Sequence, residues 1–373
     1  MSNVNRVRQI YQVAALFAGP SPAVGDHFSS GNSGVNLIQQ IPRVQSVSID
    51  TSITRQDVNQ LGQLAAVDRI ILEPPTASLD FSYLLLDGKA ESILGFSALG
   101  ESTFISGLID KTQDEKNYFV QISKEGSDAV SSTSSGDNNI LAIGNGFISN
   151  YSISLAVGQL PTASVTVDAS NAVNYTGTFN KPIPSVNPEN GQRIAGKNFS
   201  LPIAQSYTGV DIQSALRPGD IQFSLPRNAA FGSYLSGLGS VHVQSVNIAI
   251  PLSREPINRL GSTFSFAREP QFPINSTMTV EALAADIRAS SLDDILCNDA
   301  EYDLEISAKI PNCEGTGSRA ITLQFNNAKV DSTNYSLDLG SNATSSFTFS
   351  NQIAGISASN ATQGFNFSGS YAV

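Results

Sequence analysis

The sequence has few of the residues from which catalytic, metal-binding and sugar-binding sites are usually built. Its 373 residues include no tryptophan and two histidines. Without tryptophan the chain lacks the usual aromatic platform for stacking sugars. His27 and His242 lie in different halves and fit no H-x-x-E or H-x-x-x-H spacing, so we expect neither a metal site nor a histidine-based triad. No cofactor is expected either.

Cysteine is equally scarce. Cys297 and Cys313 are the only two, too few for a zinc site or a disulfide framework. We expect two reduced thiols in a protein made in the cytosol. A disulfide across a hairpin that includes residues 302–310 is the alternative.

Charged residues are also few, at 14% against about 25% in a typical soluble protein. Acidic residues outnumber basic ones by 32 to 21, for a net charge of -11, which disfavours general attraction to nucleic acid or an anionic membrane. No apolar run approaches the roughly 20 residues of a membrane helix, since residues 13–18 stop at Gly19-Pro20. We therefore expect no membrane partner.

Motifs for nucleophilic catalysis and phosphate binding are missing. The chain has no G-x-S-x-G elbow and no G-x-x-x-x-G-K-[ST] loop. Gly144-Asn145-Gly146 lacks the third glycine of a dinucleotide fingerprint and predicts a turn. The acidic pairs Asp293-Asp294 and Glu301 with Asp303 lie outside any calcium-loop pattern and indicate a solvated face. The chain is therefore predicted not to be an enzyme.

The chain does contain an internal repeat. Residues 44–62 read VQSVSIDTSITRQDVNQLG and residues 243–261 read VQSVNIAIPLSREPINRLG, with nine identities and no gap. A second match joins NYSISLAVGQLPTASVTVD at 150–168 to NYSLDLGSNATSSFTFS at 334–350, and it aligns Tyr151 with Tyr335 and Thr162 with Thr344. A period of about 190 residues is too long for a solenoid repeat. Two matched blocks in the same order predict a duplicated domain.

Within each copy the hydrophobic pattern predicts β-strands. Leu79, Phe81 and Tyr83 alternate with polar residues, as in a strand buried on one face. The predicted strands are residues 44–52, 79–85, 118–124, 151–157 and 163–168, then 243–251, 278–283, 302–309, 335–339 and 345–350. Residues 88–94 and 284–296 predict one flanking helix per copy.

Proline and glycine mark the boundary between the copies. Residues 1–180 are predicted as the first domain with an N-terminal arm, 181–215 as a connector and 216–373 as the second domain. Residues 221–225 would be the leading strand of the second domain. It would correspond to part of residues 10–40 in the first domain.

The most distinctive shared pattern is R-x-x-x-N-x-L-G, which supplies the candidate interface residues. One interpretation is a shared turn, in which two glycines supply a positive φ. The other is a contact loop between subunits, and both can hold together. The candidate residues are Arg55, Asn59, Leu61, Gly62, Arg254, Asn258, Leu260 and Gly261.

These runs resemble the major tail tube proteins of tailed phages. The resemblance rests on IPRVQSVSIDTSITRQDVNQLGQLAAVDRIILEPPTASLDFSYLLLDG and GNGFISNYSISLAVGQLPTASVTVD; it covers most of residues 35–170 and extends through the repeat to 240–372. It implies a mainly β fold: two tandem copies of a tail-tube-type β-sandwich or barrel, each with a flanking helix. Six such domains usually make a ring, so three chains would form a homotrimeric, pseudo-hexameric one.

The resemblance also implies a place in the virion, with assembly in the host cytoplasm. Stacked rings would form the tail tube, and DNA would pass through an acidic lumen without specific binding. Other partners would be the tape measure, distal tail and terminator proteins. Residues 52–73 and 252–272 would reach the neighbouring ring, and residues 1–40 would clamp between rings. The alternatives are a distal tail or baseplate ring protein, a β-sandwich adhesin or carbohydrate-binding module and, last, a hydrolase on a β-scaffold.

Overall fold

The computed structural model describes most of the chain. The described residues are 14–21, 38–100, 102–109, 114–123, 128–129, 138–188, 190–194, 196–205, 215–227, 235–236, 242–261, 264–265, 267–283, 288–289, 301–309, 319–337, 342–353 and 364–370. Strands dominate them, and the helices they contain are short. The prediction of a mainly β fold is therefore confirmed.

The elements of the first half come in the following order. They are β1 (Ala14–Pro20), β2 (Gln39–Gln40), β3 (Val44–Ser52), β4 (Arg55–Val58), β5 (Asp68–Ile71), β6 (Thr76–Leu84), α1 (Lys89–Leu94), α2 (Ser106–Ile109), β7 (Glu115–Ile122), β8 (Asn139–Ala156), β9 (Thr162–Ala169) and β10 (Asn171–Thr176). Two short strands follow them, β11 (Lys181–Pro182) and β12 (Asn198–Phe199).

The second half begins with a 3-10 turn at Pro218–Asp220. Its strands are β13 (Ile221–Arg227), β14 (Leu235–Ser236), β15 (Val243–Pro251), β16 (Arg254–Ile257), β17 (Ala267–Pro270), β18 (Asn275–Leu283), β19 (Arg288–Ala289), β20 (Tyr302–Lys309), β21 (Arg319–Ser336), β22 (Thr344–Gln352) and β23 (Gly364–Gly369).

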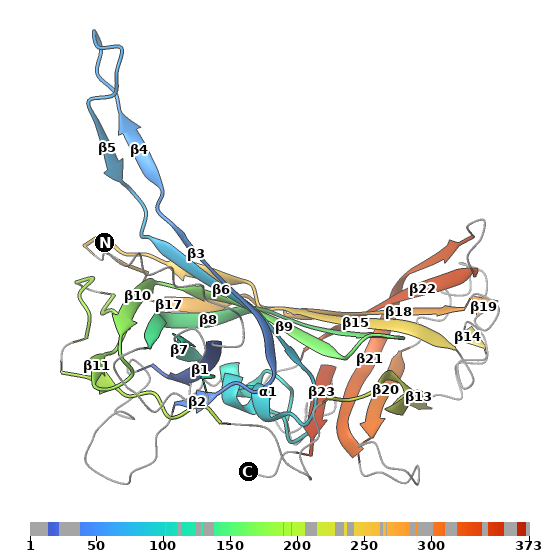
Figure 1. Cartoon of the computed structure of the whole chain (residues 1–373). Helices are drawn as coiled ribbons and strands as arrows, with labels where there is room; N and C mark the ends of the chain where they lie inside the picture. The colour runs from blue at the N-terminus through green and yellow to red at the C-terminus, as the bar shows by residue number, and fades with distance from the viewer. Residues whose placement is uncertain are drawn as a thin grey trace, which may run out of the picture.

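The upper layer is one antiparallel sheet that runs through both halves, and it curves upward at both ends (Figure 1). Its eight strands lie in the order β3-β6-β9-β8-β15-β18-β22-β21. β8 and β21 are 18 residues long, and only their C-terminal parts belong to this layer. Their N-terminal parts enter the layer beneath.

The lower layer repeats one arrangement in each half. The N-terminal part of β8 pairs with β7 and β10, and β7 pairs with β1. Likewise, the N-terminal part of β21 pairs with β20 and β23, and β20 pairs with β13. The two halves therefore pair their strands in the same order.

The registers of the two halves also correspond, residue for residue. Phe81 pairs with Val165 in the first half, as Val280 pairs with Phe347 in the second. Both long strands have a bulge where they change layers, between Ile148 and Asn150 and between Val330 and Ser332. Residues of β8 thus correspond to residues 182 positions later in and just after β21.

This register corrects one sequence alignment. Tyr151 pairs with Val165 and Thr333 pairs with Phe347, so the residue that corresponds to Tyr151 is Thr333 and not Tyr335. The sequence alignment was therefore shifted by two residues, and a shift of two leaves each side chain on the same face of the strand. The shift arose because the motif Asn-Tyr-Ser occurs at both positions, shifted by one pleat.

The core lies between the two layers. In β6, buried and more exposed residues alternate along the strand, as its sequence predicted. The main apolar cluster runs through both halves and includes Phe81, Tyr151, Ile248 and Phe349. A second cluster packs Phe199 and Ile183 of the connector against Phe17 and Phe119. The connector is therefore attached to the first half.

Several predictions can be compared with these bounds. Three predicted strands, residues 44–52, 243–251 and 302–309, coincide with β3, β15 and β20. The first predicted helix is present as α1. Most of the second, 284–296, lies outside the described residues, and its described part, Arg288–Ala289, is strand β19.

One further prediction is wrong, and a second is wrong in part. The predicted turn at residues 144–146 lies inside β8, where Asn145 has a φ of 54° and forms an irregularity in a continuous strand. Asn327 has the same φ in β21. Of the predicted arm at residues 1–40, Ala14–Pro20 is strand β1, whose Leu16 and Phe17 are buried in the first half. That segment is therefore part of the domain, while residues 1–13 and 22–37 lie outside the described part.

One carboxyl group lies within the core of the first half. Glu91 of α1 is buried and accepts hydrogen bonds from the Tyr83 hydroxyl at 2.9 Å and the Tyr151 hydroxyl at 3.1 Å. Burial raises the pKa of Glu91 from 4.5 to about 7, because the charged form loses its solvation, and the two hydroxyls offset only part of that effect. Helix α1 is thus held to the sheet by a polar contact whose strength depends on pH.

We predict that this group makes the protein less stable as pH rises. The folded protein holds a proton that the unfolded chain releases from about pH 4.5, so the stabilisation is lost as pH rises through about 7. The free energy of unfolding should fall by about 3 kcal/mol over this range. Urea unfolding should show a flatter pH profile for Glu91→Gln. Parallel profiles for the two proteins would contradict this assignment.

Candidate functional site

The two halves are joined edge to edge by a strand ladder. β15 pairs with the C-terminal part of β8, from Ser245 opposite Ala156 to Pro251 opposite Asn150. Two backbone hydrogen bonds extend it, from the Val157 N–H to the Gln244 carbonyl at 2.9 Å and from the Leu252 N–H to the Ser149 carbonyl at 2.9 Å. The ladder makes the sheets of the two halves one surface.

Apolar side chains pack under this ladder. Ile248 lies opposite Ile153, and Val246 lies opposite Leu155. All four are buried, at 1 to 5% exposure. The junction therefore combines backbone hydrogen bonds with a continuous apolar core.

The same two strand edges recur at the ends of the eight-stranded sheet. β3 corresponds to β15, and β6 covers one of its edges. The C-terminal part of β21 corresponds to that of β8, and β22 covers one of its edges. No strand in the described part of the chain pairs with the other edge of either segment. Leu337, next to the end of β21, is 79% exposed, whereas the corresponding Leu155 is 5% exposed.

The outer face of the sheet is mainly polar. Its register places one continuous row across the sheet, made of Ser46, Ser82, Ser164, Ser152, Ala249, Thr277, Ser350 and Lys329. Hydroxyl groups bridge neighbouring strands, as between Ser46 and Ser82 at 2.6 Å. The charged residues of this face are Asp50, Asp80, Asp168, Glu281 and Lys329, with Asp331 at the bulge of β21. The face is therefore rich in hydroxyls and mainly acidic.

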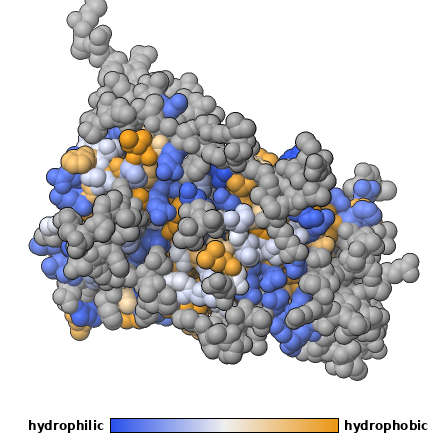
Figure 2. Space-filling view, turned by 90° about the horizontal axis from the view of Figure 1, so that it is seen from below, coloured by the Kyte–Doolittle hydropathy of each residue, from blue (hydrophilic) through white to orange (hydrophobic). Residues whose placement is uncertain are grey.

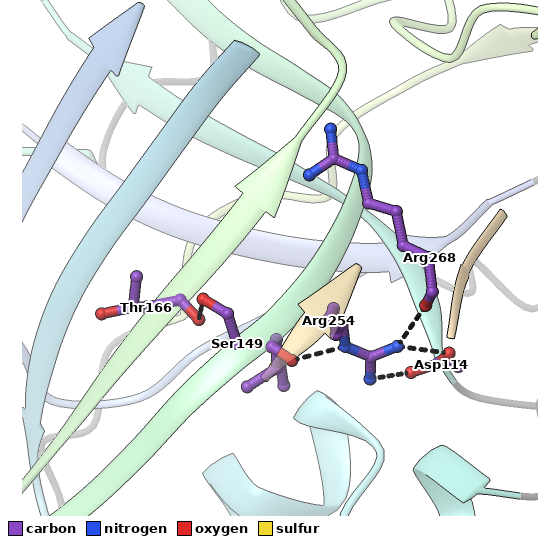
Figure 3. A network of polar contacts seen from close by, with 6 residues as sticks. Asp114, Ser149, Thr166, Arg254 and Arg268 are labelled. Carbon is purple, nitrogen blue, oxygen red and sulfur yellow. Dashed lines mark hydrogen bonds and ion pairs between the residues drawn. The ribbon is translucent and has the colours of Figure 1, made fainter. Parts of the chain in front are cut away.

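The second hairpin, β16–β17, is anchored to the first half by a buried ion pair (Figure 3). The guanidinium group of Arg254 binds both carboxylate oxygens of Asp114, at 2.5 and 2.9 Å. It also donates to the Ile148 carbonyl at 2.8 Å and lies 5.3 Å from the centre of the Phe147 ring. The side chains of Arg254 and Asp114 are 1% and 9% exposed. Such a bidentate pair fixes the hairpin in one orientation.

The first hairpin, β4–β5, projects away from the sheet and is exposed throughout (Figure 1). It has the same register as β16–β17, since Arg55 pairs with Ile71 as Arg254 pairs with Pro270. Its exposed large apolar residues, with those that flank it, are Ile53, Val58, Leu61, Leu64, Val67, Ile70, Ile71 and Leu72. By contrast, the face seen from below in Figure 2 shows apolar residues in small groups between hydrophilic ones.

The structure separates the eight candidate interface residues into two environments. Arg254 is bound within the chain, and its corresponding residue Arg55 is exposed. At the two tips the other candidates are exposed, with Leu61 at 100% and Leu260 at 103%. Gly62 and Gly261 have φ values of 88° and 85°, which confirms the prediction of a shared turn. The predicted contact between subunits stays a prediction.

The described residues offer no arrangement for metal binding. No group of three or more histidine, cysteine or acidic side chains comes together among them. Glu301 and Asp303 instead accept hydrogen bonds from the side chain and backbone of Asn327, at 2.7 and 2.9 Å. His27, Asp293, Asp294 and both cysteines lie outside the described residues. Within the described chain, no helix has the length and apolarity to cross a membrane.

No protein-family model matches the chain. No curated protein matches it either.

Sequence reasoning missed the partner of Arg254 and the open strand edges. Asp114 precedes β7 and lies 140 residues from Arg254, so no local pattern links them. The edges depend on which strands pair across the two halves. One signal was available, because Arg55 and Arg254 belong to the repeated motif.

We predict that loss of the buried ion pair destabilises the junction. Arg254→Ala leaves the Asp114 carboxylate buried without its partner and should cost about 3–5 kcal/mol of unfolding free energy. Arg254→Lys should be intermediate, since an ammonium group cannot form the bidentate contact. Urea or thermal unfolding of dilute protein measures both.

The chain supplies a matched control at the corresponding position of the exposed hairpin. Arg55→Ala should change the free energy of unfolding by no more than about 0.5 kcal/mol. An equal effect of Arg55→Ala and Arg254→Ala would show that the ion pair contributes nothing specific.

Proposed function

We propose that this protein is a non-enzymatic structural subunit of a phage tail tube, composed of two copies of one β-domain. The observation that carries the proposal is the β8–β15 ladder. It joins two similarly built halves edge to edge, while the two matching edges, on β3 and β21, lie at opposite ends of the same sheet. A chain with one donor edge and one acceptor edge associates head to tail.

The register within the chain specifies the register between chains. Transfer of the β8–β15 pairing to β21 and β3 places Ile49 opposite Tyr335 and Ser48 opposite Ser336. Apolar positions then meet on the core side and hydroxyl positions on the outer side. The half-exposed Tyr335 would become covered, as Ile153 is at the junction within the chain.

The spacing of strands sets the smallest number of chains that the ring can have. Twenty-four strands, from three chains, about 4.8 Å apart form a circle about 37 Å across before strand tilt widens it. Sixteen strands, from two chains, give about 24 Å. Side chains that extend about 5 Å inward from each wall leave an open channel about 27 Å across for three chains and about 14 Å across for two. A DNA duplex about 20 Å wide passes through the ring of three chains but not through that of two, so at least three chains are needed, as in the proposed trimer.

The outer face of the sheet is suited to line such a channel. In Figure 1 it is the concave face, and the core occupies the other side. Its hydroxyls offer no charge to bind phosphate, and its carboxylates, such as Asp50 and Asp80, repel phosphate. DNA would therefore slide without a specific contact. Assembly in the host cytoplasm, a final place in the virion and contacts with other tail proteins follow from the same proposal.

The exposed hairpin tips are the candidates for stacking one ring on the next. Both tips carry the motif Asn-x-Leu-Gly, and neither leucine contacts the body of its own chain closely enough to be covered. Exposed leucines at two corresponding places in a repeated unit favour a contact that forms only on assembly.

Electron microscopy and mass measurement of the purified protein test the proposal. We expect trimeric rings or hollow tubes at high concentration. Thr51→Pro should prevent both, because the Thr51 N–H points away from β6, to the Asp50 side chain at 2.9 Å, and would be needed at the chain-to-chain edge.

Thr51→Val is the matched control, because it keeps the N–H and should assemble like the wild type. Rings of normal size from Thr51→Pro would refute the edge contact. Rings that never stack would favour the distal tail or baseplate alternative. A folded wild-type monomer at every concentration would refute the tube.

A further inference from the structure

The intrachain contact of the second hairpin is a template for the first. β16–β17 follows β15, and β15 pairs with β8, so the hairpin lies against the end of the first half. β4–β5 follows β3 in the same way, with the same strand lengths and register. A chain whose β21 pairs with β3 would therefore receive β4–β5 at the end of its second half.

The exposed positions of the first hairpin are those that the template buries. Ile53 is 52% exposed, whereas the corresponding Leu252 is 1% exposed. Arg55 is exposed, whereas the side chain of Arg254 is 1% exposed. A hairpin with this many exposed apolar side chains is typical of a binding element.

The receiving position exists on the second half and repeats the polar framework of the first. Asn145 donates its side-chain amide to Glu115 at 2.7 Å and its backbone N–H to Asn117 at 3.2 Å. Asn327 makes the same two contacts, with Glu301 and Asp303 at 2.7 and 2.9 Å. The frameworks around the two docking positions thus correspond.

The two positions differ in occupancy. In the first half, the second hairpin fills this position and leaves little space. Arg268 of β17 and Phe264 of the tip segment lie beside Glu115, Asn145 and Phe147. In the second half, the corresponding surface is an open depression of about 840 Å³. It is lined by Glu301, Asn327, Lys329, Asp331 and Gln352, among others.

Charge in this depression is suited to an arginine. Asp331 lies at the bulge of β21, the position that Ser149 has in β8. It follows Val330, whose carbonyl corresponds to the Ile148 carbonyl. Glu301 lies in the same depression. Lys329 replaces Phe147, so one ammonium group faces two carboxylates and the site keeps a net negative charge.

We propose that the β4–β5 hairpin of one chain docks into this depression on a second copy of the chain, with Arg55 bound by Asp331 and Glu301. The contact rests on the proposed ring, because the same chain-to-chain step pairs β3 with β21. It makes each junction between chains a two-part contact: a strand ladder and an anchored hairpin. The occupant is the chain itself, because the docked hairpin within the chain has the same register and the same arginine.

A charge swap tests the contact. Arg55→Glu and Asp331→Arg should each weaken association at least about tenfold, as expected for a charged pair at an interface. The double variant should recover most of that loss. Asp331 is the residue to exchange because Glu301 also holds Asn327. Sedimentation of full-length protein over a range of concentrations measures association, and Arg193→Glu, an exposed change of the same charge on the connector, is the control.

Each outcome decides between the two proposals. Loss in both single variants and recovery in the double variant supports hairpin docking. Association of both single variants at wild-type strength, with Thr51→Pro still monomeric, overturns hairpin docking and leaves the tube standing. A wild type that does not associate at any concentration overturns both.

Discussion

The edge-to-edge ladder between β8 and β15 is the interaction on which the rest of the structure depends. It converts two four-stranded sheets into one surface, with a shared core beneath it and a shared polar face above it. It also determines where the second hairpin lies, since β16–β17 continues directly from β15. The proposed ring requires no new kind of contact. It repeats between chains the contact that already joins the halves within one chain.

The two halves show what that contact does to otherwise corresponding residues. Where a neighbour is present, the arginine of the shared motif is buried, paired and bound to a backbone carbonyl. Where no neighbour is present within the chain, the same arginine stands on an exposed hairpin whose apolar side chains are uncovered. A buried ion pair is weak evidence for net stability, because the cost of desolvating both charges offsets their attraction. We infer that its role is to hold the hairpin in one position while the ladder supplies most of the association.

Local pattern predicted the strands well where apolar and polar residues alternate. β3, β15 and β20 have the predicted bounds because alternation of apolar and polar residues is strong there. It failed in β8, where Gly144-Asn145-Gly146 suggested a turn; the strand absorbs Asn145 as a bulge because Asn117 and Glu115 bind it. The repeat indicated that Arg254 matters, but Asp114 could be found only from the tertiary structure. The order of strands across the two halves likewise depends on long-range pairing, which the periodicity of the sequence does not reveal.

Disulfide trapping tests the central claim, that β3 of one chain pairs with β21 of the next, most directly. In a Cys297→Ser, Cys313→Ser background, Ser48→Cys with Ser336→Cys should give covalent dimers and trimers on mild oxidation. Ser154→Cys with Asn247→Cys, the corresponding pair within the chain, should close an intrachain bond and serves as the positive control. Ser48→Cys with Ser332→Cys, four residues out of register, should stay uncrosslinked. If Ser48 and Ser336 crosslink no better than this misregistered pair while the positive control closes, the edges do not meet as proposed.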